Sequence, residues 1–154
     1  MFKNNKEISP KLPIPSENGD LKALSKIPID NLSGIDAYRL GWMYELGFGI
    51  RKDRKRSVRY FAAAVEKGNL DAATRLAYMY SNGIGVAVDK ARAKSLYLLA
   101  GRQADSIACY NLGLMSSDDA TSFFWFYKSA VLGDVDAQHK VGFALETGKG
   151  VPVN

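Results

Sequence analysis

Residues 72–89 read AATRLAYMYSNGIGVAVD, and this stretch decides the fold. Its first half places apolar residues at helical spacing. Gly83 and Gly85 follow, and glycine adopts the left-handed backbone angles that end a helix and turn the chain. Asp89 can then cap a second helix, because its carboxylate accepts the free amide hydrogens at a helix start. The stretch therefore predicts a helix, a tight turn and a second helix.

The same pattern recurs along the chain. A leucine returns at a spacing of 36 residues, at Leu40, Leu76 and Leu112. The glycine turn returns as GFGI at 47–50, GIGV at 83–86 and GKGV at 148–151. A fixed period of about 20 to 50 residues indicates a stacked array of repeats. We call the first helix of each repeat helix A and the second helix B.

The spacing divides most of the chain into repeats, with expected boundaries at 36–71, 72–107, 108–136 and 137–154. The third repeat is short, because only 29 residues separate Leu112 from Val141. The missing residues include the glycine turn, so Ser117 or Asp118 must start its helix B. The fourth repeat reaches its glycine turn and has no helix B, which leaves helix A exposed. Either the chain was cut there or another molecule occupies the exposed groove.

Two segments precede the repeats. Residues 1–19 contain Pro10, Pro13 and Pro15, and proline disfavours helix at and before its own position. We expect an extended or disordered arm, which is either a docking tail or a mobile end. Residues 20–35 are expected to cap the array, with a two-turn helix over 20–27 stopped by Pro28.

The composition fits an ordinary globular domain. The chain has 154 residues, a net charge of +5 and one cysteine, Cys109. A single cysteine excludes an intramolecular disulfide framework and a cysteine-based zinc cluster. The first 20 residues lack the apolar core of a secretory signal, and no run of about 18 apolar residues predicts a membrane span. A cytoplasmic protein is therefore expected, although secretion without a signal stays open.

The repeats closely resemble the Sel-one-like repeat (SLR) family. The second repeat carries the resemblance at Ala72, Leu76, Tyr80, Gly83, Gly85, Val86, Asp89 and Ala93. The first and fourth repeats match at Leu40, Gly41, Tyr44, Gly47, Gly49, Asp53, Phe61, Ala64, Gly68, Ala137, Gly142, Gly148, Gly150 and Val151. The resemblance implies an all-α solenoid of antiparallel helix pairs, wound into a right-handed superhelix. It also implies a non-catalytic adaptor or scaffold in protein complexes.

Several helix A positions are not needed for the predicted core, and they form columns when repeats stack. In such superhelices the A helices generally line the concave side. Aromatic residues beside arginine are typical of protein-binding surfaces. The predicted partner-binding residues are Tyr38, Arg39, Trp42, Thr74, Arg75, Tyr78, Tyr110, Asn111, Leu114, His139 and Phe143. Packing between repeats is the alternative role for the aromatic columns, and a solvated face is the alternative for the basic one.

The densest charge run is RKDRKR at 51–56, followed by Arg59. Cations at a helix start oppose the helix dipole, so the run indicates either an acidic partner or a solvated edge. Nucleic acid is disfavoured, since it requires a broader basic stripe with stacking aromatics.

Chemistry of its own is not predicted for this chain. His139 is the only histidine, so no histidine-based catalytic triad can form, and Cys109 is interpreted as a buried thiol. The G-x-G turns lack the lysine and hydroxyl residue of a phosphate-binding loop. No cofactor or metal is expected.

The sequence therefore predicts a non-enzymatic adaptor that binds a protein or peptide on the A-helix face, and the basic charge excess favours an acidic partner. One alternative is an immunity or inhibitor-type protein that blocks a specific enzyme. The other is a scaffold that self-associates through the open fourth repeat. The oligomeric state is left open between a monomer and such an assembly.

Overall fold

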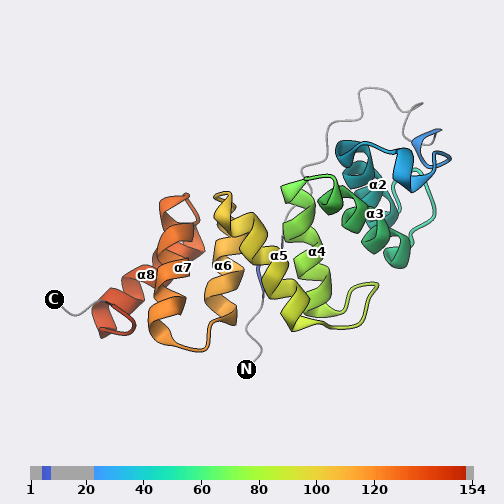
Figure 1. Cartoon of the computed structure of the whole chain (residues 1–154). Coiled ribbons are helices and arrows are strands. Elements are labelled where there is room, and N and C mark those ends of the chain that lie inside the picture. The colour runs from blue at the N-terminus through green and yellow to red at the C-terminus, as the bar shows by residue number, and fades with distance from the viewer. Residues whose placement is uncertain (1–4, 8–22, 152–154) are drawn as a thin grey trace.

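The chain folds as a row of helix pairs. The computed structural model describes residues 5–7 and 23–151. Between residues 29 and 147 it contains a short 3-10 helix, η1 (Ile29–Asn31), and seven α-helices and no strand. The α-helices are α2 (Gly34–Leu46), α3 (Arg54–Glu66), α4 (Leu70–Asn82), α5 (Lys90–Arg102), α6 (Ser106–Met115), α7 (Asp119–Val131) and α8 (Val135–Thr147). Each packs mainly against its neighbours in sequence, so the array extends from α2 to α8 (Figure 1). The predicted all-α solenoid is confirmed.

Polar side chains begin the helices as the sequence predicts. The carboxylate of Asp53 accepts the amide hydrogen of Arg56 at 3.0 Å, and Asp89 accepts that of Arg92 at 2.9 Å. In the shortened third repeat the cap is Asp118, which accepts the amide of Thr121 at 2.8 Å. The A helices start in the same way, with caps at Ser33, Asn69, Asp105 and Asp134.

Glycine ends the A helices of the repeats that keep the turn. Gly47, Gly83 and Gly148 have φ values of 77°, 72° and 69°, and each lies at a left-handed C-cap. The third repeat has Ser116 at this place in an extended conformation, and its α6 has 10 residues instead of 13. Losing the glycine turn therefore shortens helix A as well as the connection.

Each helix pair packs through a small residue on helix A and an aromatic ring on helix B. A methyl group built on Gly41 would lie 2.7 Å from the ring of Phe61, and one on Gly113 would lie 2.7 Å from the ring of Phe126. The repeated leucines fill the space beside these contacts, with Leu40 at 0% and Leu112 at 1% exposure. Burying such a side chain contributes about 1.5–3 kcal/mol, so these contacts hold the pairs together.

The segment before α2 covers the first helix pair. Leu32 is buried, and Leu24 and Ile29 pack against the core formed by α2 and α3. Residues 23–27 are the described part of the expected helix over 20–27, and within them Ala23 and Leu24 are helical and a turn follows. Residues 20–22 and most of the predicted arm lie outside the described residues. Among the helices that are described, none combines the length and the apolar character that crossing a membrane requires.

Candidate functional site

Residues 5–7, which we call the docked segment, lie against the A helices, separated in sequence from the rest of the described chain. Their side chains and main chain contact α4, α6 and the start of α8. In Figure 1 the segment is the short dark-blue stretch near α5 and α6. We call the surface formed by α2, α4, α6 and α8 the A-helix face. These contacts are made within the chain, and whether the whole arm of residues 1–19 is a docking tail or a mobile end stays a prediction.

Asn111 forms two hydrogen bonds with the main chain of the docked segment. Its Oδ1 accepts the amide hydrogen of Lys6 at 2.7 Å, and its Nδ2 donates to the carbonyl of Lys6 at 2.9 Å. The Asn111 side chain is buried in α6, so both of its polar ends are fixed in direction. A paired contact of this kind holds an extended backbone in one register, whatever its side chains are.

The Lys6 ammonium lies between two carboxylates at the start of α8. Its Nζ donates to Asp134 at 2.6 Å and to Asp136 at 2.8 Å, and it lies 5.1 Å from the centre of the Tyr110 ring. Partial burial opposes the charge, but the hydrogen bonds and charges of the two aspartates outweigh it, so the Lys6 pKa is raised. The hydrogen bond from Lys6 lowers the pKa of Asp136. Both shifts show that the contact favours the charged forms.

Arg75 holds the acidic side chain of the docked segment. Its Nη1 donates to Glu7 at 2.9 Å, while its Nε donates to Glu45 of α2 at 2.9 Å and its Nη2 donates to the other oxygen of Glu45. The Arg75 side chain is only 3% exposed. Burial opposes its charge, yet the two glutamates outweigh that cost and raise its pKa.

Aromatic rings fix the plane of the Arg75 guanidinium. The guanidinium carbon lies 4.7 Å from the centre of the Trp42 ring and 5.0 Å from that of Tyr78. Cation–π contacts of this kind strengthen when the cation is removed from water. The two rings and Glu45 hold the guanidinium so that Nη1 points at the docked segment.

Three of the sequence-predicted residues serve the core. Trp42 is 1% exposed, and its ring packs at 5.5 Å from Phe61 and 6.3 Å from Tyr38. Tyr38 is also buried, and Thr74 donates to the Asp105 cap of α6 at 3.0 Å. Trp42 and Tyr38 therefore pack in the core, whereas Tyr78 and Tyr110 of the same two predicted columns are half-buried and Phe143 is exposed. Trp42 contributes to the surface only through Arg75.

The predicted basic column does not form a uniform basic stripe. Arg75 is neutralised by Glu45, and Arg39 pairs with Asp36 at 3.3 Å on its own helix. The opposite end of the face is acidic at Asp134 and Asp136, so the surface has charge of both signs. The partner of Arg75 comes from a neighbouring helix, whereas the partner of Arg39 lies on the same helix.

The remaining predicted residues are spread along the A-helix face. Arg75, Tyr78, Tyr110 and Asn111 meet around the docked segment. Leu114 is half-buried on α6, one turn away from Tyr110. His139 and Phe143 are exposed on α8, and Phe143 is 60% exposed.

Sequence reasoning missed Glu45, Asp134, Asp136 and the docked segment itself. Asp134 carried a local signal, because it stands where Asn69 and Asp105 cap earlier A helices. That signal predicts a cap, and Asp134 does accept the amide of Ala137 at 2.9 Å. Its second role toward Lys6 depends on residues that are 128 positions apart, which no local pattern indicates.

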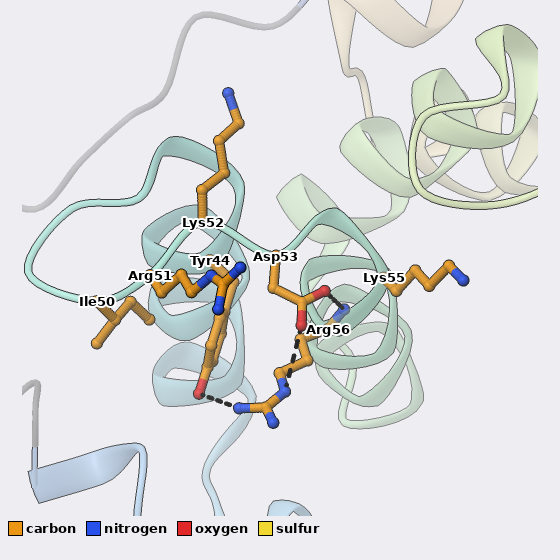
Figure 2. A pocket seen from close by; sticks show the side chains of 7 residues that line it. All are labelled: Tyr44, Ile50, Arg51, Lys52, Asp53, Lys55 and Arg56. Carbon is orange, nitrogen blue, oxygen red and sulfur yellow. Dashed lines mark hydrogen bonds and ion pairs between the residues drawn. The ribbon is translucent and has the colours of Figure 1, made fainter.

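In the basic run at the start of α3, Arg56 contacts residues of its own repeat. Arg56 donates to the hydroxyl of Tyr44 at 3.4 Å and pairs with Asp53 at 3.4 Å (Figure 2). Arg92 repeats this arrangement with Tyr80 and Asp89. These contacts give the hydroxyls of Tyr44 and Tyr80 polar partners. Arg51, Lys52 and Lys55 are exposed around the same hollow, as Figure 2 shows.

The repeats match a known family. The family model of the Sel1 repeat matches residues 36–69, 70–105, 106–134 and 135–154. The chain belongs to the Sel1 repeat family. Sel1 repeat proteins are generally scaffolds for protein interactions and are typically non-catalytic.

Two solved structures show how similar the array is to other Sel1 repeat proteins. One is a protective antigen of uropathogenic Escherichia coli strains with an SLR fold, which has 29% identity and a TM-score of 0.74 over 77% of this chain and 27% of that chain. The other is a Sel1 repeat protein from Oxalobacter formigenes, which has 29% identity and a TM-score of 0.75 over 87% of this chain and 40% of that chain. The Sel1 array described here therefore spans less than half the length of either protein. No curated protein matches the chain.

Proposed function

We propose that this Sel1 repeat chain is a non-catalytic scaffold whose A-helix face binds an extended segment of a partner protein. The observation that carries the proposal is the paired contact between Asn111 and the main chain of Lys6, at 2.7 and 2.9 Å. This contact recognises a backbone rather than a particular side chain. Tyr78, Tyr110 and Arg75 surround it with the residue types that dominate protein-binding energetics.

A peptide selection tests this proposal. Twelve-residue peptides displayed from a random library are selected on the full chain carrying Lys6→Ala and Glu7→Ala, which weaken the docked segment. The enriched peptides are then measured against the same chain with Asn111→Ala or Arg59→Ala added. Arg59 is exposed on α3, away from the A-helix face, and serves as the matched control. We expect binding to weaken at least tenfold in Asn111→Ala and to stay unchanged in Arg59→Ala. Enriched peptides that bind both variants equally would contradict the proposal, provided circular dichroism shows both variants folded.

Self-association is a second candidate, and the exposed apolar surface of α7 and α8 favours it. Phe124, Tyr127, Phe143 and Leu145 are each 55–60% exposed. A hollow beside them is lined by Ala120, Phe123, Phe124, Tyr127, Gly150 and Val151. Light scattering over a range of concentrations tests this candidate. A mass that stays monomeric at the highest concentration would exclude it.

A further inference from the structure

The docked segment shows which kind of peptide the A-helix face accepts. We propose that this face selects an extended peptide in which a lysine is followed directly by a glutamate, and that residues 5–7 occupy it as an internal competitor. The inference rests on the proposed function, because it names the ligand of the same surface. Three neighbouring positions of the bound chain are each held by different chemistry.

The middle position sets the register. Asn111 contacts both the amide and the carbonyl of Lys6, so the residue at this place must present its side chain toward the start of α8. At the preceding position the side-chain Nδ2 of Asn5 donates to the hydroxyl of Ser81. The same hydroxyl also accepts a hydrogen bond from Lys90 at 3.2 Å. These contacts fix where the neighbouring side chains fall along the face.

The lysine site has a net negative charge. Asp134 and Asp136 supply two carboxylates to one ammonium, and the face of the Tyr110 ring covers its third side. The titratable groups that face Asp136 from its own helix are His139 and Lys140. A compact ammonium with three donors fits two carboxylates and a ring, whereas an acidic side chain would be repelled.

The glutamate site is a single directed donor. Glu45 occupies two of the Arg75 nitrogens, and Nη1 remains for the incoming carboxylate at 2.9 Å. Exchanging the order of lysine and glutamate would place a carboxylate beside two aspartates and an ammonium beside Arg75. Both contacts would become repulsive, so the order of the two residues determines affinity.

An attached ligand competes strongly with a free one. A segment that belongs to the same chain as its site binds intramolecularly, so its occupancy does not depend on the protein concentration. The apparent affinity of a free peptide falls in proportion to the fraction of empty sites. A partner segment therefore has to displace residues 5–7, and weakening these residues makes the face more accessible.

Fluorescence anisotropy with a labelled synthetic peptide tests the proposal. The probe has the sequence FKNNKEIS, taken from residues 2–9. The control probe exchanges the lysine and glutamate that correspond to Lys6 and Glu7, which gives FKNNEKIS. The proteins are the full chain and its Lys6→Ala/Glu7→Ala double variant. We expect the double variant to bind the first probe at least tenfold more tightly than the wild type does. We also expect it to prefer the first probe over the exchanged one by at least tenfold.

Matched substitutions in the double variant locate the binding. Asp136→Asn removes one carboxylate from the lysine site, whereas Asp119→Asn changes an exposed aspartate in the first turn of α7. We expect the first change to weaken binding at least threefold and the second to leave it unchanged. In a ¹⁵N spectrum of the double variant, the side-chain amide of Asn111 is expected to shift when the peptide is added.

Three results would overturn the inference. They are equal affinity of the two probes, no gain in affinity in the double variant, and no binding of either probe by a double variant that is folded. The proposed function fails separately, if library-selected peptides bind the double variant equally well with and without Asn111→Ala. Selected peptides that require Asn111 and lack the lysine–glutamate pair would support the scaffold and contradict this inference.

Discussion

Ala104 adopts a left-handed backbone conformation at the place where the first repeat has Gly68. The φ values are 62° for Ala104 and 82° for Gly68. A residue with a Cβ loses about 1–2 kcal/mol in this conformation relative to the right-handed one, and glycine does not. We therefore expect Ala104→Gly to raise the free energy of unfolding by about 1 kcal/mol. Urea denaturation followed by circular dichroism measures the change.

Gly68→Ala is the reciprocal control. A Cβ added at Gly68 has no atom within 4 Å, so the substitution reports on backbone conformation without a steric clash. We expect it to lower the free energy of unfolding by about 1 kcal/mol. If Ala104→Gly lowered the free energy of unfolding, the left-handed conformation of Ala104 would not be a source of instability.

Cys109 is fully buried beside the carbonyl of Gly101, with Sγ at 3.7 Å from that oxygen. Burial disfavours the thiolate and raises the pKa of the thiol above its ordinary value of 9.0. We expect the folded chain to react with a disulfide reagent at pH 8 at least about a hundredfold more slowly than the unfolded chain. Absorbance of the released thiolate measures both rates.

The same shift has a consequence for stability at high pH. The unfolded chain loses the Cys109 proton near pH 9.0, whereas the folded chain retains it to higher pH. The unfolded state is therefore favoured progressively as the pH rises above 9.0, and Cys109→Ala should reduce that dependence. Rapid labelling of the folded chain at pH 8 would show that the thiol is accessible, and it would contradict both predictions about Cys109.

At the scale of the element, the second glycine of the later two G-x-G turns lies against the preceding repeat. A Cβ on Gly85 would overlap the carbonyl of Arg54 at the start of α3, and one on Gly150 would overlap that of Asp119 at the start of α7. The first turn differs, because a Cβ on Gly49 would meet only Met43, at 3.9 Å. The glycine therefore serves close approach between helix pairs as well as turning the chain.

Alanine substitutions at two of these glycines separate the two roles. Gly49→Ala should cost about 1 kcal/mol from the left-handed backbone alone. Gly85→Ala carries the same cost and must also move α3, so we expect a total of about 2–4 kcal/mol. Chemical denaturation of the two variants side by side measures the difference. Equal losses would show that the contact with Arg54 relaxes without cost.

The local elements were the predictable part of this fold. The caps at Asp53 and Asp89 and the left-handed glycines at Gly47 and Gly83 depend on residues within a few positions of each other. The repeat period then sets which helices pair. Local chemistry and the period were therefore sufficient to predict the helix pairs and their order.

The candidate site was predictable only in part. The repeat register placed Arg75, Tyr78, Tyr110 and Asn111 on the A-helix face. It could not show that Trp42 is buried under the Arg75 guanidinium, because burial depends on how tightly successive repeats approach. It also gave no indication of the docked segment, whose partners are 68 to 130 residues away in sequence.

At the scale of the whole molecule, the docked segment connects the second, third and fourth repeats. Helix contacts in this array run mainly between neighbours, from α2 to α8. Lys6 and Glu7 contact α4, α6 and the start of α8 together. Arrays with neighbour contacts alone open independently at their ends.

Hydrogen exchange tests this connection. In the Lys6→Ala/Glu7→Ala variant we expect the amides of α8 to exchange about tenfold faster, because Asp134 loses its ion pair while it still caps the helix. The amides of α3, which the docked segment does not contact, serve as the internal control. Unchanged exchange in α8 would show that the segment does not stabilise the last repeat.

The double role of Asp134 also makes the end of the array sensitive to what lies on its face. One of its oxygens caps α8 through the amide of Ala137, and the other binds the Lys6 ammonium. Removing the lysine leaves a nearly buried carboxylate whose charge is balanced mainly by the helix start. A partner with lysine at this place would preserve the order of α8, whereas a partner without it would loosen the last repeat. The identity of one ligand residue would thus be transmitted as the rigidity of a helix.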